Sequence, residues 1–193
     1  MIYTNKLDNY KVVEWTPSYK VAQSQGWTLI LKEEDVERGY DGNWYLTGHT
    51  PKQPIEELHT ITFQHIDSIT SQAILSGFDY EINGERLHFS YDQFDQTNFN
   101  QTANVATLSL SGIEGLPQEI TWNAYRNYTK ESGGELVRVT LSNVQFIDLY
   151  VNGASKHKAI QMEIGGQRKA QIKLCSTKEE IDNLLQEWGI HIN

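Results

Sequence analysis

The chain has 193 residues, a length that suits one medium domain or one domain with a small appendage. Its 16 lysines and arginines against 25 aspartates and glutamates give a formal net charge of −9 at pH 7, which argues against a nucleic-acid-binding surface. The single cysteine, Cys175, excludes an internal disulfide and a cysteine-based zinc cluster. No segment has the apolar stretch of a signal peptide or the ~20 apolar residues of a membrane span. We therefore expect a protein made in a cytoplasm, without membrane insertion.

Residues 1–53 are predicted to form a small β-rich unit. Short strands are expected at residues 12–15, 27–31 and 44–46. Residues 32–38 favour one or two helical turns, which Gly39 would end in a left-handed conformation. The two prolines Pro51 and Pro54 indicate a linker, so we place the second domain at residues 54–193.

The second domain is predicted to begin with a helix and a β-hairpin. Apolar residues from Leu58 to Ile74 recur at roughly helical spacing, and Gly77 can end that helix. Apolar and polar residues then alternate on both sides of Asn83-Gly84, the residue pair typical of a type I′ turn. This pattern predicts the cross-strand pairs Phe78/Phe89, Tyr80/Leu87 and Ile82/Glu85, with the aromatic rings on one face.

The rest of the second domain is predicted to alternate between helices and a second strand pair. A helix rich in glutamine and asparagine is expected from its N-cap Asp92 to about Ala106, followed by strands at residues 120–125 and 136–141. Ser142 with Gln145 forms a capping-box pattern, and Gly165-Gly166 is expected to break or kink the helix that follows. A second capping box is expected at residues 176–179, before a final amphipathic helix.

These elements predict an α+β fold, in which a small N-terminal β-rich unit precedes a domain of β-hairpins packed with helices and a helical C-terminus.

The sequence contains no pattern that identifies an enzyme. Its six histidines share no zinc-ligand spacing, and it lacks both a nucleophile elbow and a glycine-rich phosphate loop, so no metal or cofactor is expected. His88 lies on the outward face of the predicted hairpin and is interpreted as an ordinary surface or boundary residue. Asp79 and Glu81 share a strand face about 7 Å apart, a spacing compatible with a glycosidase, but that face is expected to be solvent-exposed.

Two segments resemble proteins of bacteriophage tails. Residues 33–51, which include Gly39-Tyr40-Asp41-Gly42-Asn43-Trp44, are similar to the N-terminal module of short proteins from the tail regions of phages and prophages of gut-type bacteria. Residues 77–185 resemble an uncharacterised phage domain found in tail-fibre and tail-fibre-assembly proteins. The features that carry this second likeness are Gly77–Tyr80 with Asn83–Glu85, the glutamine- and asparagine-rich helix, Trp122 with Tyr125, Leu141–Phe146 and Lys173–Ile181.

The resemblance implies a non-enzymatic structural and binding protein of the tail tip, baseplate or fibre. Such a protein is made in the cytoplasm of the host bacterium and carried in the tail of the virion. Its partners would be other tail proteins and a host surface glycan, and an oligomer is compatible with this role. Two alternatives stay open: a tail-fibre assembly chaperone and a glycan-degrading enzyme.

Four aromatic side chains of the N-terminal unit are candidate contact residues, because aromatic rings stack on sugars and fill pockets of protein partners. They are Trp27, Tyr40, Trp44 and Tyr45. The alternative is that these rings form the core of the small unit. Trp44 and Tyr45 are neighbours in one predicted strand, where successive side chains point to opposite faces, so at least one of them is expected to point outward.

Overall fold

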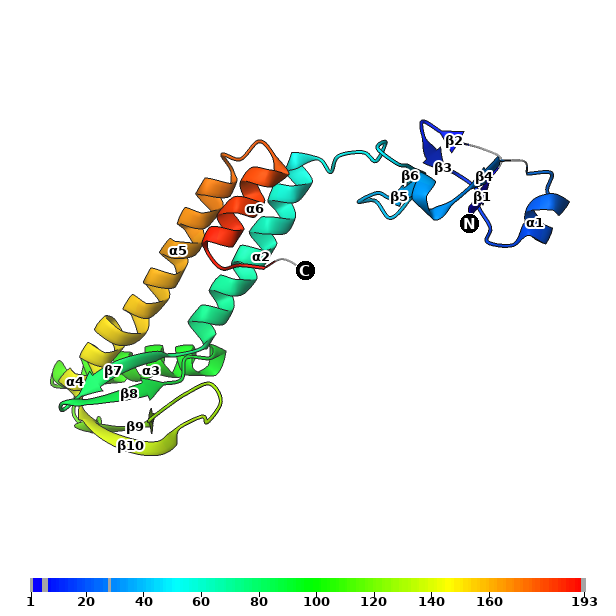
Figure 1. Cartoon of the computed structure of the whole chain (residues 1–193). Helices are drawn as coiled ribbons and strands as arrows, with labels where there is room; N and C mark the ends of the chain where they lie inside the picture. The colour runs from blue at the N-terminus through cyan, green and yellow to red at the C-terminus, as the bar shows by residue number, and fades with distance from the viewer. Residues whose placement is uncertain (1, 5–6, 28, 192–193) are drawn as a thin grey trace. The chain divides into compact units, whose positions relative to one another are not determined.

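The computed structural model of the protein describes residues 2–4, 7–27 and 29–191 (Figure 1). By its internal contacts the chain divides into two units, Met1–Leu58 and His59–Asn193, whereas the sequence placed the boundary between residues 53 and 54. Helices and antiparallel sheets are both present, which confirms the predicted α+β class.

The N-terminal unit consists of short strands around a small core. Among the residues that the structure describes, one sheet has the strand order β2-β3-β6-β5 and another pairs β1 with β4. Val12, Leu31 and Val36 are buried at its centre. The elements are β1 (Ile2–Thr4), β2 (Leu7–Asp8), β3 (Lys11–Val12), α1 (Tyr19–Ser24), β4 (Leu29–Leu31), η1 (Glu33–Asp35), β5 (Val36–Arg38) and β6 (Trp44–Leu46).

The predicted helical turns at residues 32–38 are only partly correct. A single 3₁₀ turn, η1, is held by the Asp35 carboxylate, which accepts a hydrogen bond from the backbone N–H of Lys32 at 2.8 Å. From Val36 onward the chain is a strand that pairs with β6, with Val36 opposite Leu46. Burial of Val36 in the core and its backbone pairing outweigh the local helical preference of this charged segment.

The C-terminal unit contains one antiparallel sheet with the strand order β10-β9-β8-β7. Its strands are β7 (Phe78–Ile82), β8 (Glu85–Phe89), β9 (Glu119–Arg126) and β10 (Glu135–Ser142). The predicted hairpin register is confirmed, with Phe78 opposite Phe89 and Ile82 opposite Glu85. Asn83 and Gly84 have φ values of 52° and 83°, as a type I′ turn requires.

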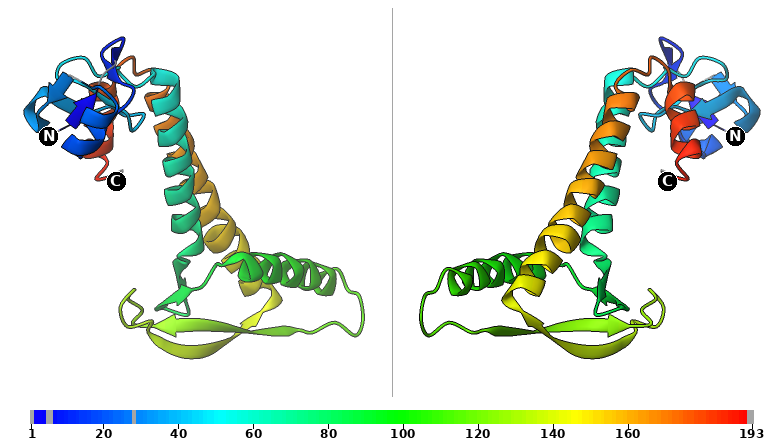
Figure 2. Two further views of the ribbon diagram at one scale, coloured as in Figure 1. Left: turned by 90° about the vertical axis from the view of Figure 1, so that its right-hand side faces the viewer. Right: turned by 90° about the vertical axis from the view of Figure 1, so that its left-hand side faces the viewer.

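Helices cover one face of this sheet in the C-terminal unit. They are α3 (Gln93–Leu110), α4 (Asn143–Asp148) and the π-helical turn η2 (Leu149–Ser155), which continues from α4. Figure 2 shows α3 crossing one side of the sheet. Phe89, Phe99 and Phe146 are fully buried between the sheet and these helices. The opposite face of the sheet carries the alternate, more polar positions of each strand.

Two long helices, α2 (Ile55–Leu75) and α5 (Lys156–Ile172), lie side by side and antiparallel (Figure 2). The predicted break at Gly165-Gly166 is wrong, because α5 runs through both glycines. Gly165 is buried against Thr70, and a Cβ at this position would lie 2.4 Å from Thr70 Oγ1. The glycine therefore permits close approach of the two helices instead of interrupting one of them.

The last helix, α6 (Lys178–Glu187), begins one residue later than the predicted capping box. Thr177 is the N-cap, and its hydroxyl accepts a hydrogen bond from the backbone N–H of Glu180 at 3.2 Å. The Glu180 carboxylate in turn accepts hydrogen bonds from the N–H groups of Ser176 and Thr177. The capping box predicted for Ser142 and Gln145 is confirmed at the start of α4.

Gly77, which follows the end of α2, lies in close contact with the backbone of the hairpin. Its φ is +84°, and a Cβ would lie 2.3 Å from the carbonyl oxygen of Phe89. Gly84 has nearly the same φ, +83°, but a Cβ there meets nothing within 4 Å. We expect Gly84→Ala to lower the free energy of unfolding by about 1 kcal/mol, the cost of a left-handed alanine. Gly77→Ala should cost about 3 kcal/mol or more, because backbone must also move. Urea denaturation followed by circular dichroism measures both, and equal losses would contradict the close approach.

A second prediction concerns Tyr80, whose hydroxyl donates a hydrogen bond to Asp148 Oδ2 at 2.5 Å and so ties β7 to α4. This bond, burial and the charge of Asp148 raise the pKa of Tyr80 to about 12 from its ordinary value of 10.0. The folded state therefore keeps a proton that the unfolded state loses, and stability from this pair falls as pH rises from about 10 through 12. Asp148→Asn should lower the phenol pKa toward its ordinary value in an ultraviolet titration, because it removes the charge and the strong acceptor while burial remains. An unchanged titration would contradict this contact.

Candidate functional site

The two hairpins of the C-terminal unit meet at one backbone bridge, between His88 of β8 and Tyr125 of β9. Charged and aromatic side chains gather around this bridge on the sheet face that the helices leave uncovered. They line a hollow of about 290 Å³ formed by Asp79, Arg86, Leu87, His88, Tyr125, Asn127 and Tyr128. We describe this cluster as the junction site.

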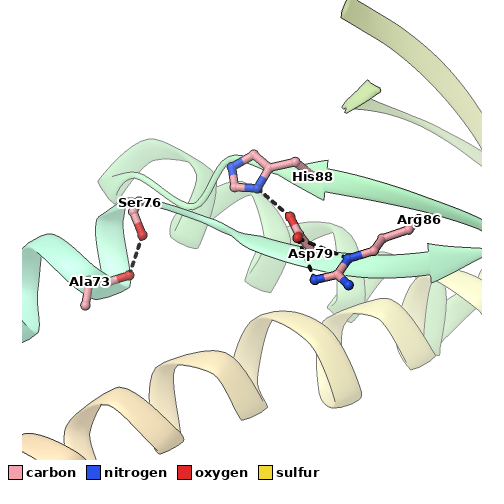
Figure 3. A network of polar contacts seen from close by, with 5 residues as sticks. All are labelled: Ala73, Ser76, Asp79, Arg86 and His88. Carbon is pink, nitrogen blue, oxygen red and sulfur yellow. Dashed lines mark hydrogen bonds and ion pairs between the residues drawn. The ribbon is translucent and has the colours of Figure 1, made fainter. Parts of the chain in front are cut away.

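Asp79 is the centre of the polar contacts in the junction site (Figure 3). Its Oδ1 lies 2.9 Å from His88 Nδ1, and its Oδ2 accepts a hydrogen bond from Arg86 Nη2 at 2.9 Å. Because an ionised carboxylate only accepts hydrogen bonds, Nδ1 of His88 carries the proton. Burial works against the charge of Asp79, but the hydrogen bonds and charges of His88 and Arg86 outweigh it and hold the pKa of Asp79 below its ordinary value.

His88 is buried, although it lies on the outward face of the hairpin. Tyr128 covers it, with the two ring centroids 3.7 Å apart and the planes within 4° of parallel. Its Nε2 edge lies against Gly77, where a Cβ would be 2.7 Å away. Only 8% of the residue is exposed, so of the two settings expected for His88, surface or boundary, the surface setting is wrong. The reason is the loop after β9, which returns over the sheet and brings Tyr128 onto the ring.

A larger cleft of about 530 Å³ lies next to the junction site, and Tyr125 lines both. It separates β9 from the side of α3, beyond the point where β8 ends at Phe89. The sequence predicted Trp122 and Tyr125 in a strand and the polar residues of α3 in a helix, and both are features of the resemblance, but none of them was assigned to a binding site. The signal that could have indicated the cleft is the difference in length between two strands. β8 is short and pairs with only a small part of the longer β9.

The polar side chains of the junction site are engaged with one another. The Asp79 carboxylate is occupied by two donors, and the ring of His88 is covered by Tyr128. No serine, threonine or cysteine is among the described residues that line the hollow.

Within residues 2–4, 7–27 and 29–191, no three histidine, cysteine, aspartate or glutamate side chains gather as a metal site would require. In the same part of the chain, no helix is long and apolar enough to cross a membrane.

The four aromatic candidates of the N-terminal unit have different surroundings. Tyr40 is 47% exposed, and Trp27 is half-buried. Trp44 packs against the cluster of Val12, Leu31 and Val36. Tyr45 is buried, and its hydroxyl donates a hydrogen bond to Asp41 Oδ2 at 2.8 Å. Trp44 and Tyr45 thus both contribute to the interior of the unit, which leaves Tyr40 as the most exposed of the four rings.

Comparisons with known proteins identify no relative. No family model matches the chain, and neither a curated protein nor a solved structure does. Interpretation of the site therefore depends on its own geometry and on the sequence resemblance described above.

The pKa of Asp79 provides a test of the junction site. Because its folded-state pKa lies below the unfolded value of 3.8, its contribution to stability is present above that pH and is lost as pH falls through the folded-state pKa. Arg86→Met should raise the carboxyl pKa of Asp79 in a carbon-detected NMR titration, because it removes two hydrogen bonds. Arg138→Met, at an exposed position of β10, should leave it unchanged. Equal effects of the two variants would contradict the arrangement.

Proposed function

We propose that the protein is a non-enzymatic structural and binding protein of a bacteriophage tail, located at the tail tip, the baseplate or the fibre. The observation that carries this proposal is the uncovered face of the β10-β9-β8-β7 sheet, with the junction site and the neighbouring cleft. The location in a tail is supported by the sequence resemblance of residues 33–51 and 77–185.

Asp79, His88 and Tyr128 of the junction site are held by contacts with their neighbours before any ligand arrives. The Asp79 carboxylate accepts hydrogen bonds from Arg86 and His88 of the neighbouring strand β8. The ring of Tyr128 stacks on that of His88. A surface whose rotamers are already restricted loses little conformational entropy on binding. Such preorganisation favours recognition of a partner without chemical change.

The N-terminal unit offers a separate contact surface. Tyr40 is exposed beside the turn of Asp41 and Gly42, and Asp41 is held by hydrogen bonds from Asn43 and Tyr45. Exposed tyrosines on rigid turns are common anchors in protein interfaces. In the proposed role this unit contacts other tail proteins, and the uncovered sheet face remains free for a second partner.

A tail-fibre assembly chaperone is the second candidate, and a specific observation favours it. The helices of the C-terminal unit expose large apolar side chains, with Phe94 on α3 82% exposed and Val144 on α4 62% exposed. Exposed apolar side chains are typical of surfaces that bind another protein. A chaperone would use them on an unassembled fibre and then dissociate.

Quantitative mass spectrometry of purified particles tests the proposal. The sample is the phage, or the induced prophage, that encodes the chain. We expect a fixed copy number per particle of about three, six or a multiple of these, because symmetric assemblies contain equal numbers of each subunit.

Two other results would count against a virion component. Abundance in the infected lysate together with absence from particles would favour the chaperone. Hydrolysis of host polysaccharide by the purified protein would favour the enzyme, and Asp79→Asn would then show whether the junction site is responsible.

A further inference from the structure

The cleft beside the junction site is a gap within the sheet. β9 pairs with β10 along its whole length, from Glu119 to Arg126, whereas it pairs with β8 only at Tyr125. Three consecutive residues of β9, Thr121, Trp122 and Asn123, line the cleft. Successive strand residues point to opposite faces, so only the edge of a strand presents three in a row to one space. The cleft therefore occupies the place where a neighbouring strand would continue.

Polar side chains form both walls of the cleft. Asp95, Asn98 and Thr102 follow one another along a single face of α3 and line one wall, and Thr121 and Asn123 line the other. These hydroxyl, amide and carboxylate groups combine donors and acceptors of hydrogen bonds.

The acidic end of the cleft is fixed by the capping box of α3. Asp92 Oδ1 accepts a hydrogen bond from the backbone N–H of Asp95 at 2.8 Å, and Asp95 Oδ2 accepts one from the N–H of Asp92 at 3.3 Å. Each carboxylate keeps acceptor capacity for a further partner. Among the described residues, no cationic side chain lines the cleft, so its charge opposes the binding of an anion.

Two aromatic residues of β9 line the cleft from opposite faces of the sheet. Trp122 is half-buried and held against Phe99 and Phe146, with ring centroids 4.5 Å and 4.9 Å away. Tyr125 lines the cleft and the junction site, and its ring centroid lies 6.1 Å from that of Tyr128. Trp122 therefore borders the cleft on the helix-covered side of the sheet, whereas Tyr125 and Tyr128 lead from the cleft to the junction site on the uncovered face.

We propose that this cleft binds a neutral oligosaccharide, with one sugar unit against Tyr125 on the uncovered face of the sheet and the chain extending toward Tyr128. A sugar presents hydroxyl groups that both donate and accept hydrogen bonds, and apolar C–H faces that pack on aromatic rings. An apolar ligand would leave the polar walls unpaired, and an anionic one would face Asp92 and Asp95. The volume of about 530 Å³ is in the range of ligand-binding pockets. The inference rests on the proposed binding role and names its ligand class.

An NMR titration of the purified full-length protein tests this site. The probes are three neutral hexasaccharides, the α-1,4- and β-1,4-linked hexamers of glucose and the β-1,4-linked hexamer of N-acetylglucosamine, and one anionic control, the hexamer of galacturonic acid. We expect at least one neutral probe to shift the amide signals of Asn98, Thr121 and Asn123 and the indole signal of Trp122. The anionic hexamer should leave them unchanged.

Matched variants on α3 and β9 show whether the binding is local. Asn98→Ala combined with Asn123→Ala removes one amide from each wall and should weaken binding about tenfold, as expected for the loss of two hydrogen bonds. Asn104→Ala changes an exposed asparagine on another side of α3 and should leave the affinity unchanged.

The proposal is overturned if none of the three neutral probes shifts these signals, if the shifts lie elsewhere, or if the wall variant and Asn104→Ala behave alike. Shifts of the same signals by a short threonine- and valine-rich peptide, without any by the sugars, would identify a strand-binding gap instead. The titration needs no virus particle, so its failure is distinct from absence of the protein from particles.

Discussion

The bridge between His88 and Tyr125 joins the two hairpins of the C-terminal unit into one sheet. A single backbone bridge contributes few hydrogen bonds between β8 and β9. Side-chain contacts on both sides of the bridge also hold the two hairpins together. Tyr128 stacks on His88, and Arg126 forms an ion pair with Glu85 from the neighbouring hairpin. The bridge also positions Tyr125 between the junction site and the cleft, so both depend on it.

The gap beside this bridge follows from the way β8 ends. Tyr91 is buried in the core, and Asp92 caps α3 through its reciprocal hydrogen bonds with Asp95, so the chain turns away from β9 after Phe89. Helix α3 then covers one face of the sheet with Phe99, Ala103 and Ala106. Continuing β8 along β9 would remove the cap and this burial, whereas the observed path leaves one edge of β9 without a strand partner. The same residues that stabilise the fold therefore create the cleft.

Local signals predicted most of the elements of the C-terminal unit. Asn83-Gly84, Asp92 and Ser142 each act through neighbouring backbone, and the hairpin register, the start of α3 and the start of α4 are as expected. The predictions failed where distant contacts decide the outcome. Gly165 remains helical because Thr70 of another helix lies against it, and Val36 is a strand residue because β6 pairs with it. The junction site was missed for the same reason, since Tyr128 reaches His88 across 40 positions of the chain, a separation that no local pattern encodes.

The central claim is that β8 and β9 meet at a single bridge with an open cleft beyond it. A nuclear Overhauser spectrum of the isotopically labelled protein tests this most directly. We predict cross-strand contacts between His88 and Tyr125 and ring contacts between His88 and Tyr128, with no strand opposite Thr121 on the cleft side. A continuous ladder of cross-strand contacts from Tyr125 to Thr121 on that side would contradict the account, because it would close the cleft.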